Sequence, residues 1–361
     1  MFCISPGRMA AEAPAWILRG LSPRPTVVLL RHREALGDTL MLSALARGLK
    51  RFDPKLRVEV VCRRPELFAG NPHVDQARGW HLWRRRHTSG QSYKREELAE
   101  PVHVVEIQWR KLWRDLAEQG FPGASGEPPA PLDGVHPEIF LTAAEREQGR
   151  ARAGALGPEE KPLILLGSGG KLKPTHNREW GRENYQGLVD LLAPHARLAQ
   201  IGGDDRLAAG GAALPDFGAL PVREAAALFA AADALLVQEG GLMHTARAVG
   251  APTVAIFGGY VLPSQTGYAE QTNLWARPEC SPCIPASVNC PHLKCMVEIT
   301  PRRVLEALSD LVAKRRGEGL PAVAIAKASS AWQPPSFVDP AQLAEARRAA
   351  VPRAETPARE G

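Results

Sequence analysis

The chain has 361 residues, 44% of them apolar and 23% charged, a balance typical of a globular protein that is long enough for two domains. The net charge of +6 and the pI near 9.1 favour anionic partners such as phosphorylated ligands, acidic lipids or nucleic acid, without choosing among them. No apolar run approaches the roughly 20 residues of a transmembrane helix. Residues 1–21 carry scattered charges and two prolines rather than a signal-peptide core, so we expect a cytoplasmic protein, with Met9 as an alternative start.

The chain opens with a predicted strand, loop, helix and strand. Thr26–Arg31 is β-branched and apolar, Arg33–Asp38 is a loop, and Thr39–Arg51 has leucines at helical spacing. Arg57–Cys62 is the next strand, and Val102–Ile107 is expected as a later strand of the same sheet. This order is typical of a parallel doubly wound sheet.

The same pattern restarts after a predicted boundary near Leu156-Gly157-Pro158. Before it, Thr142 and Glu145 have capping-box spacing for a helix over 142–152. The later elements are expected as strands at Pro162–Leu166, Arg197–Ile201, Ala234–Val237 and Thr253–Phe257, and as helices at Glu183–Leu192, Val222–Ala231, Leu242–Val249 and Arg302–Lys314. We therefore expect an extension (1–24), two Rossmann-like domains (25–157 and 158–316) and a largely disordered tail (317–361).

The first candidate site follows the first strand, at Leu36-Gly37-Asp38. Ligands of parallel α/β sheets bind at the carboxyl ends of strands, where Gly37 allows close backbone approach and Asp38 would serve as a general base. The alternative is that Asp38 only caps the helix that starts at Thr39.

The second candidate site is a strand–glycine–helix turn over 237–246. Free backbone N–H groups and the helix dipole favour a diphosphate there. Glu239 is a candidate acceptor for ribose hydroxyls, and His244 a candidate donor to phosphate. The alternative is a tight turn with a packed histidine.

The third candidate site is the glycine-rich turn of residues 166–171, which includes Ser168 and Lys171. Lys171, Lys173 or Arg178 would neutralise phosphate charge, although the spacing is not that of a Walker loop. The alternative is a surface loop.

Four of the six cysteines cluster within sixteen positions, at Cys280, Cys283, Cys290 and Cys295. In a reducing compartment this spacing favours tetrahedral zinc or iron over disulfides. Four ligands leave no open position, so the expected role is structural; buried free thiols are the alternative.

Together these motifs resemble glycosyltransferase family 9, the heptosyltransferase family, over roughly residues 25–315. The matching segments are the Leu-Gly-Asp loop at 36–38, Asn71-Pro-His-Val-Asp75, Gly202-Gly203-Asp204-Asp205, Gly-Leu-Met-His at 241–244 and Gly250–Gly258. The resemblance implies a GT-B fold, in which two Rossmann-like domains face each other across a cleft.

It also implies an inverting transferase in which Asp38 is the base and residues 240–244 (Gly240, Gly241, Leu242, Met243 and His244) cradle the diphosphate. Together with Gly37, Ser168, Lys171, Arg178 and Glu239, these are the expected nucleotide-sugar contacts. The family needs no catalytic divalent metal, because the helix dipole and basic residues stabilise the leaving group. Some heptosyltransferase-like proteins carry a comparable cysteine finger. Here Glu239-Gly240 replaces the family's usual Asp or Ser followed by Thr, and the Lys-x-Trp-Pro pattern is changed around Arg178.

The resemblance suggests a donor such as ADP-heptose and an anionic saccharide or glycolipid acceptor. Trp80, Trp83, Trp109 and Trp113 interleave with basic residues, so this stretch is either an acceptor or membrane-surface contact or a solvated face over packed tryptophans. We expect peripheral contact with the inner membrane and no nucleic acid, since no such motif is present. Two alternatives stay open: an inactive GT-B binding protein and a non-hydrolysing nucleotide-sugar epimerase.

Overall fold

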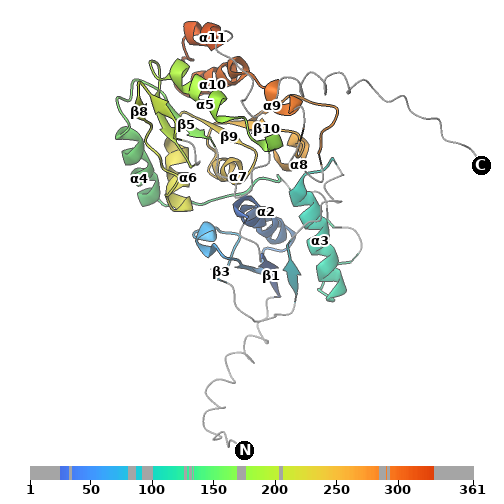
Figure 1. Ribbon diagram of the computed structural model, residues 1–361. Coiled ribbons are helices and arrows are strands. Elements are labelled where there is room, and N and C mark those ends of the chain that lie inside the picture. Colours follow the sequence, from blue (N-terminus) through green and yellow to red (C-terminus); the bar gives the residue numbers. More distant parts are fainter. Residues whose placement is uncertain are drawn as a thin grey trace, which may run out of the picture.

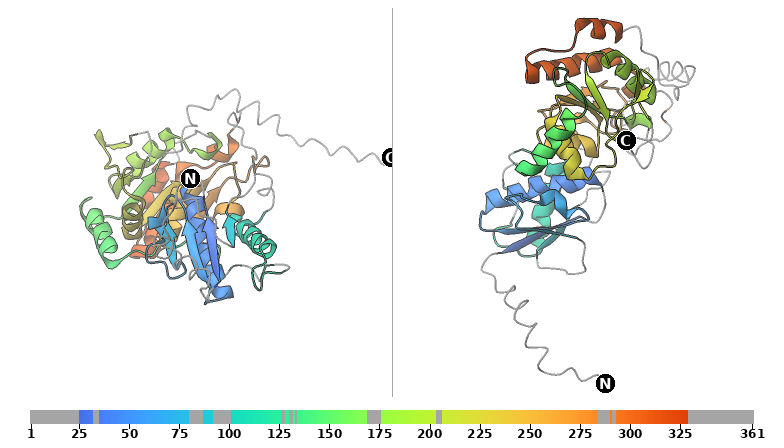
Figure 2. Two further views of the ribbon diagram at one scale, coloured as in Figure 1. Left: turned by 90° about the horizontal axis from the view of Figure 1, so that it is seen from below. Right: turned by 90° about the vertical axis from the view of Figure 1, so that its left-hand side faces the viewer.

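The computed structural model describes residues 25–31, 35–79, 87–91, 101–125, 128–129, 132, 134–168, 176–202, 206–283, 290 and 293–328. They form two parallel α/β units, one above the other in Figure 1 and in the right-hand view of Figure 2. The expected α/β class with two doubly wound sheets is confirmed.

The first domain is built on a sheet with strand order β3-β2-β1-β4, in which every pair is parallel. Its elements are β1 (Thr26–Leu30), α2 (Leu36–Phe52), β2 (Arg57–Val61), η1 (Pro65–Phe68), β3 (Gln76–Arg78), β4 (Thr88–Gly90) and α3 (Val104–Glu118). From β1 the chain first builds outward through β2 and β3, and β4 then pairs on the other side of β1. The carboxyl ends of β1 and β4 therefore form a topological switch point, where such sheets bind ligands.

The strand expected over Val102–Ile107 is wrong, because this segment begins helix α3. His103 is the N-cap, and its Nδ1 accepts a hydrogen bond of 3.2 Å from the Val105 N–H. The apolar positions continue at helical spacing to Leu116, so the short run is the start of an amphipathic helix and not a strand. Trp109 and Trp113 lie buried on this helix, as the packing interpretation of these two tryptophans predicts, whereas Trp80 and Trp83 lie outside the described residues.

The second domain has a five-stranded parallel sheet in the order β11-β10-β9-β5-β6. Its elements are α4 (Ala143–Gly154), β5 (Leu163–Gly167), η3 (His176–Arg178), α5 (Arg182–Leu192), β6 (Arg197–Gln200), the hairpin β7 (Ala208–Ala209) and β8 (Ala212–Ala213), α6 (Val222–Ala231), β9 (Ala234–Gln238), α7 (Gly241–Ala248), β10 (Thr253–Phe257), α8 (Pro263–Thr266), β11 (Thr272–Trp275), α9 (Lys294–Val297), α10 (Pro301–Arg316) and α11 (Ala322–Ala328). Its switch point lies between β5 and β9.

Helix α4 packs with the second domain, although the expected boundary near residue 157 assigns it to the first. The capping box of Thr142 and Glu145 is present. A Cβ atom on Gly149 would lie 2.3 Å from the Ala227 carbonyl oxygen, so this glycine allows α4 to contact α6 closely. Since α4 packs against α6, the chain crosses between the domains along residues 134–142, before this helix begins.

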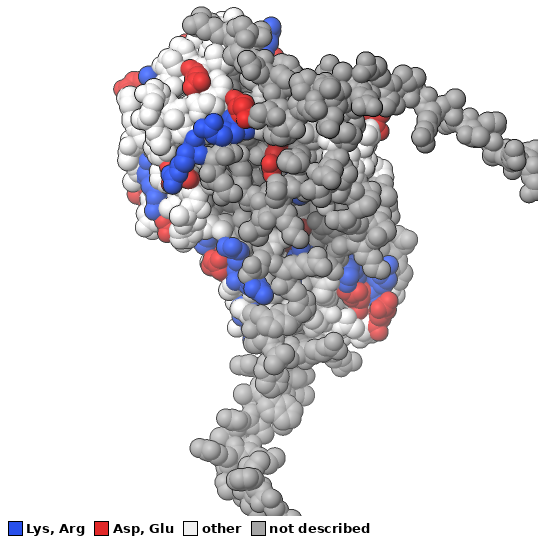
Figure 3. All heavy atoms as spheres, in the orientation of Figure 1, with Lys and Arg blue, Asp and Glu red and all other residues white. Residues whose placement is uncertain are grey.

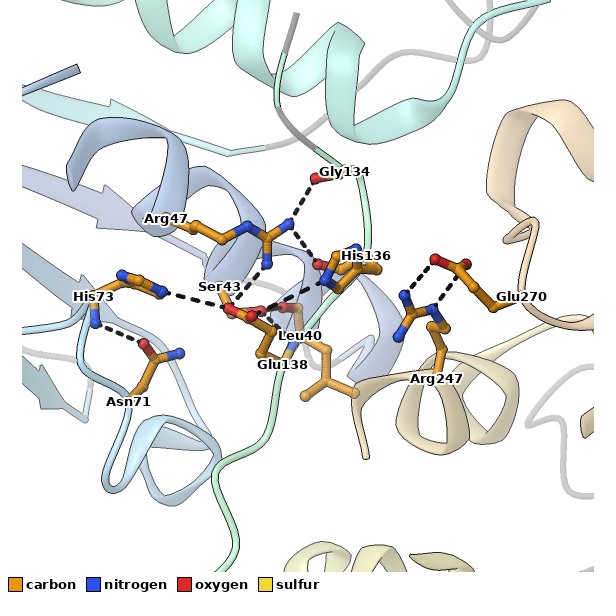
Figure 4. Close-up of polar contacts among 10 residues, drawn as sticks. All are labelled: Leu40, Ser43, Arg47, Asn71, His73, Gly134, His136, Glu138, Arg247 and Glu270. Carbon is orange, nitrogen blue, oxygen red and sulfur yellow. Dashed lines mark hydrogen bonds and ion pairs between the residues drawn. The ribbon is translucent and has the colours of Figure 1, made fainter. Parts of the chain in front are cut away.

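A polar cluster ties this crossing segment to the first domain (Figure 4). Glu138 lies 2.9 Å from Arg47, and its carboxylate also faces His73 at 3.8 Å and His136 at 4.0 Å. Burial lowers the pKa of both histidines, so they are neutral at neutral pH. The Glu138 N–H donates to Ser43 Oγ at 2.8 Å, which joins the segment to α2.

Helix α2 lies between the two sheets and packs against α7 (Figure 1). Apolar side chains of both domains, including Leu40 of α2 and Met243 of α7, belong to one continuous core. A second core lies on the other face of the second sheet, under α5 and α10. The buried α2–α7 contact therefore holds one domain against the other.

The folded part of the chain extends beyond residue 316, where the disordered tail is expected to begin. Helix α11 packs on α10 and α5, and Leu320 and Ala324 are buried. Residues 329–361 of the expected tail lie outside the described residues. In the described part of the chain, no helix is long and apolar enough to cross a membrane. On the face in Figure 3, basic and acidic side chains lie next to one another.

Candidate functional site

The switch points of the two sheets meet where α2 and α7 begin. A Cβ atom placed on Gly37 would lie 2.2 Å from Cδ2 of His244. A Cβ atom on Gly241 would lie 3.2 Å from the Leu36 Cβ. The predicted Leu-Gly-Asp and Gly-Leu-Met-His segments are thus in direct contact.

In the first domain, Asp38 does not cap a helix. Helix α2 begins at Leu36 rather than Thr39, its N-cap is Ala35, and Asp38 lies in the first turn. The Asp38 carboxylate instead forms an ion pair with Arg31, which follows β1. Arg31 is buried and donates a second hydrogen bond of 2.8 Å to the Gln91 carbonyl oxygen, just beyond β4. The guanidinium thereby bridges the β1–β4 switch point and orients Asp38 there.

In the second domain, Gly240 makes the turn from β9 into α7. Its φ of +145° is one that side-chain-bearing residues rarely adopt, and it is the N-cap residue of the helix. The N–H groups of the first turn are the ones a helix leaves without intrahelical partners. Met243 is fully buried in the core, so its side chain serves packing, whereas His244 lies in the first turn against Gly37.

Arg178 and Glu239 are brought together as an ion pair. The Arg178 guanidinium also lies 4.6 Å from the centre of the Tyr260 ring, in cation–π geometry. Sequence reasoning gave these two residues separate ligand contacts, but here each is also the partner of the other.

The segment that carries Arg178 is anchored on both sides. The Trp180 N–H donates to the side-chain oxygen of Gln238 at 3.0 Å, and the Trp180 indole donates to the Ile299 carbonyl oxygen at 2.6 Å. A Cβ atom on Gly258 would lie 1.7 Å from the Asn177 carbonyl oxygen, so only glycine lets this segment lie against the end of β10. Arg178 is therefore positioned by the tertiary structure rather than by its own short 3₁₀ turn.

The glycine-rich turn after β5 is only partly described. Ser168 is buried at the end of β5, and its Oγ has no hydrogen-bond partner among the described residues. Leu242 of α7 lies against Gly167, the last residue of β5, since its Cδ1 would be 3.0 Å from a Cβ atom on that glycine. Lys171 lies outside the described residues.

Sequence reasoning missed Arg31, Gln238 and Tyr268. The Tyr268 hydroxyl lies 2.7 Å from Nδ1 of His244, and both side chains are buried. Arg31 had a usable signal, since it directly follows the first strand. Tyr268 had none, because it belongs to a loop 24 positions from His244 along the chain.

Two of the four clustered cysteines, Cys283 and Cys295, lie beside Gly259, just beyond the end of β10. The Cys283 N–H donates to the Gly259 carbonyl oxygen at 2.5 Å, and a Cβ atom on Gly259 would be 3.1 Å from the Cys283 sulfur and 3.4 Å from that of Cys295. Burial, together with the nearby cysteines, raises the pKa of the Cys283 thiol to about 11 and that of the Cys295 thiol to about 12. Among the described residues, no three or more side chains are arranged to hold a metal ion.

Comparison with known proteins supports the resemblance. Residues 130–293 match the sequence model of glycosyltransferase family 9, described as heptosyltransferase. The chain carries a glycosyltransferase family 9 domain. No curated protein matches the chain in sequence.

Solved glycosyltransferases share its fold. E. coli ADP-heptose LPS heptosyltransferase II is 18% identical, with a TM-score of 0.57, over 80% of this chain and 99% of that one. A family 9 glycosyltransferase from Veillonella parvula is 14% identical, with a TM-score of 0.57, over 80% and 98%. The iron-containing dodecameric glycosyltransferase TibC from enterotoxigenic E. coli is 18% identical, with a TM-score of 0.51, over 81% and 77%. The GT-B fold expected for a family 9 enzyme is confirmed, and the protein is a glycosyltransferase.

Proposed function

We propose that this family 9 protein is an inverting glycosyltransferase. It transfers a heptose or related sugar from a nucleoside diphosphate sugar to a saccharide or glycolipid acceptor. The observation that carries the proposal is the contact between Gly37 and His244, because it brings the first turn of α2, which contains Asp38, to the first turn of α7 in the other domain. We infer the donor from the similar E. coli protein, which is an ADP-heptose LPS heptosyltransferase.

In the proposed reaction, the Asp38 carboxylate takes the proton of an acceptor hydroxyl. The acceptor oxygen attacks the anomeric carbon, the bond from that carbon to the diphosphate oxygen breaks, and the nucleoside diphosphate leaves. Attack from the opposite side inverts the configuration. Arg31 holds Asp38 in place, so the base does not have to be ordered when the acceptor arrives.

The leaving diphosphate would rest on the N–H groups at the start of α7. These groups and the helix dipole stabilise negative charge without a divalent cation. His244, Ser168 and Arg178 would supply side-chain donors, and Glu239 would accept from ribose hydroxyls. The buried Ser168 Oγ and Arg178 Nε have no partner among the described residues, which supports a ligand at this place.

The test is a screen of nucleotide sugars, with ADP-heptose first, for thermal stabilisation and for release of nucleoside diphosphate with and without a saccharide acceptor. A bound ligand at about 100 times its dissociation constant adds roughly 2.7 kcal/mol of stability. Acceptor-dependent release is the expected result. Stabilisation without release for any acceptor would favour the inactive binding protein, and conversion of the sugar without acceptor would favour the epimerase.

We also propose that Cys280, Cys283, Cys290 and Cys295 hold one structural zinc or iron ion. Four thiols are a donor set that suits either metal, and the sulfur atoms of Cys283 and Cys295 lie 3.1 Å and 3.4 Å from the same Cβ position on Gly259. TibC, whose structure is similar, is an iron-containing glycosyltransferase. A metal there would fix the loop to the end of β10, beside Asn177.

Elemental analysis of protein purified without added metal checks the metal proposal. About one equivalent per chain is expected, and Cys283→Ser should release it and lower the thermal midpoint. Cys62→Ser is the matched control, because Cys62 is a buried thiol of the first domain. Metal-free protein of full stability would contradict the proposal.

The location is part of the same proposal, in the cytoplasm with peripheral contact to the inner membrane. The net charge of +6 supports contact with anionic lipid. Cosedimentation with vesicles containing anionic lipid, compared with neutral vesicles, tests it; equal binding to both would count against it.

A further inference from the structure

Tyr268 is a buried tyrosine between two histidines. Its hydroxyl lies 2.7 Å from Nδ1 of His244, and the two rings meet edge to face with centroids 5.6 Å apart. On the other side, the His103 ring lies 5.4 Å away. All three side chains are at most 6% exposed. The contact is therefore shielded from water, where an unsatisfied hydroxyl proton would be costly.

In the hydrogen bond between Tyr268 and His244, either the hydroxyl or the imidazole could be the donor. The surroundings favour the hydroxyl. In the described part of the chain, Nδ1 of His244 is the partner found for the Tyr268 hydroxyl. If the imidazole donated, the hydroxyl proton would be buried without an acceptor. Burial also raises the pKa of Tyr268 well above its usual value, so the hydroxyl keeps its proton. The tyrosine is thus the donor, and Nδ1 of His244 is the acceptor.

A neutral imidazole whose Nδ1 accepts must carry its proton on Nε2. The Nε2 edge faces the first domain, since a Cβ atom on Gly37 would lie 2.9 Å from Nε2. Gly37 is followed by Asp38, and His244 lies in the first turn of α7. The proton is therefore directed toward the place where the two switch points meet.

We propose that Tyr268 is a positioning residue that fixes His244 as the tautomer with its proton on Nε2, so that His244 serves as a hydrogen-bond donor to the diphosphate of the donor substrate. This inference rests on the proposed function for the identity of the ligand but not for the tautomer. Tyr268 touches no reacting atom and acts through His244.

The test is nitrogen-15 NMR of protein labelled at histidine, with the His244 signals assigned from His244→Gln. The wild-type protein should show a protonated Nε2 and an unprotonated Nδ1. Tyr268→Phe, which removes only the hydroxyl, should give a mixture of tautomers and weaken binding of ADP by roughly three- to tenfold. Tyr185→Phe is the matched control, because its buried hydroxyl bonds the Gly167 carbonyl oxygen instead, and it should leave the His244 signals unchanged.

A wild-type His244 with its proton on Nδ1 overturns the proposal, and so does a Tyr268→Phe spectrum identical to wild type. The wild-type spectrum decides the tautomer even if Tyr268→Phe does not fold. Titration with ADP tests the proposed function separately. If ADP left the Nε2 signal unmoved while the tautomer was as expected, the diphosphate site would be wrong and the positioning role of Tyr268 for His244 would stand.

Discussion

The junctions β1–α2 and β9–α7 have the same parts arranged in two ways. Each has a strand end, glycine, a helix start and an acid paired with arginine. At β1–α2 the pair is Arg31 and Asp38, seven positions apart. At β9–α7 the pair is Arg178 and Glu239, 61 positions apart, and the arginine comes from another loop. The acid and the arginine of the first junction belong to one segment, whereas the arginine of the second junction comes from a distant loop.

Under the proposed function, the two carboxylates have different roles. A carboxylate fixed by its own segment, in the first turn of a helix, keeps one orientation, as a base requires. A carboxylate whose arginine partner belongs to a separate loop can exchange that partner for a ligand, as a donor site requires. The following experiments test whether the two acids differ in this way.

The largest effect is expected for Asp38→Asn. Loss of a general base should lower the rate of sugar transfer by a factor of about 10²–10⁴, because the Asn amide cannot accept the proton of the acceptor hydroxyl. ADP affinity should be nearly unchanged, because the Asn side chain has the same size as that of Asp and can still contact Arg31. Steady-state release of nucleoside diphosphate with acceptor present measures the rate. If the variant keeps more than half the wild-type rate, Asp38 is not the base.

Gly37→Ala should break the contact between the junctions. The new Cβ would lie 2.2 Å from the His244 ring, so the helices must separate, which should cost about 1–3 kcal/mol of unfolding free energy and weaken ADP binding. Gly187→Ala in α5 is the matched control: nothing lies within 4 Å of its Cβ, and it should gain about 0.4–1 kcal/mol. Urea unfolding measures the free energy of unfolding of both variants and of the wild-type protein. If Gly37→Ala were as stable as Gly187→Ala, the two junctions would not be in contact.

Glu239→Gln should change the affinity for ADP and the affinity for pyrophosphate in different ways. We expect ADP affinity to fall by roughly three- to tenfold, because ribose loses a charged acceptor, while pyrophosphate affinity stays the same or rises as Arg178 loses its carboxylate partner. Calorimetric titration with both ligands measures this. The control is Glu270→Gln, which removes the partner of Arg247 elsewhere in the domain. Parallel losses for both ligands would remove Glu239 from the ribose site.

The smallest effect is expected for the contacts of Arg223, which connect the two domains. Arg223 of α6 binds Glu145 and donates to the carbonyl oxygens of Phe140 at 2.8 Å and of Glu66, in the first domain, at 3.2 Å. The Arg223 guanidinium lowers the pKa of Glu145 from 4.5 to about 2. A lowered folded-state pKa stabilises the protein above pH 4.5, and this contribution is lost as the pH falls toward 2.

Glu145→Gln should therefore lower the unfolding free energy by about 1 kcal/mol at neutral pH and by less at pH 3. Chemical unfolding of both proteins at the two pH values measures the difference. A loss that is the same at both would show that the ion pair does not account for it.

Local patterns were sufficient where a segment interacts mainly with itself or with one covering layer. Strands β1, β2 and β10, helix α6 and the Thr142 capping box were all predicted to within about one residue at either end, because alternation, helical spacing and caps are local properties. The same approach failed at Val102–Ile107, since a short apolar run fits a strand as well as the start of a buried helix. It also gave no indication that α4 packs against α6, because packing partners are not encoded locally.

The amino-acid sequence by itself determined the two α/β units, the two strand–glycine–helix junctions and the presence of Asp38, Glu239 and His244 at them. Only the tertiary structure decided which distant side chains two of them contact: Arg178 for Glu239 and Tyr268 for His244. The physical reason is that a glycine or a helix start depends on the backbone of a few adjacent residues. A buried ion pair or hydrogen bond depends on which distant segments the sheet order brings to the same edge.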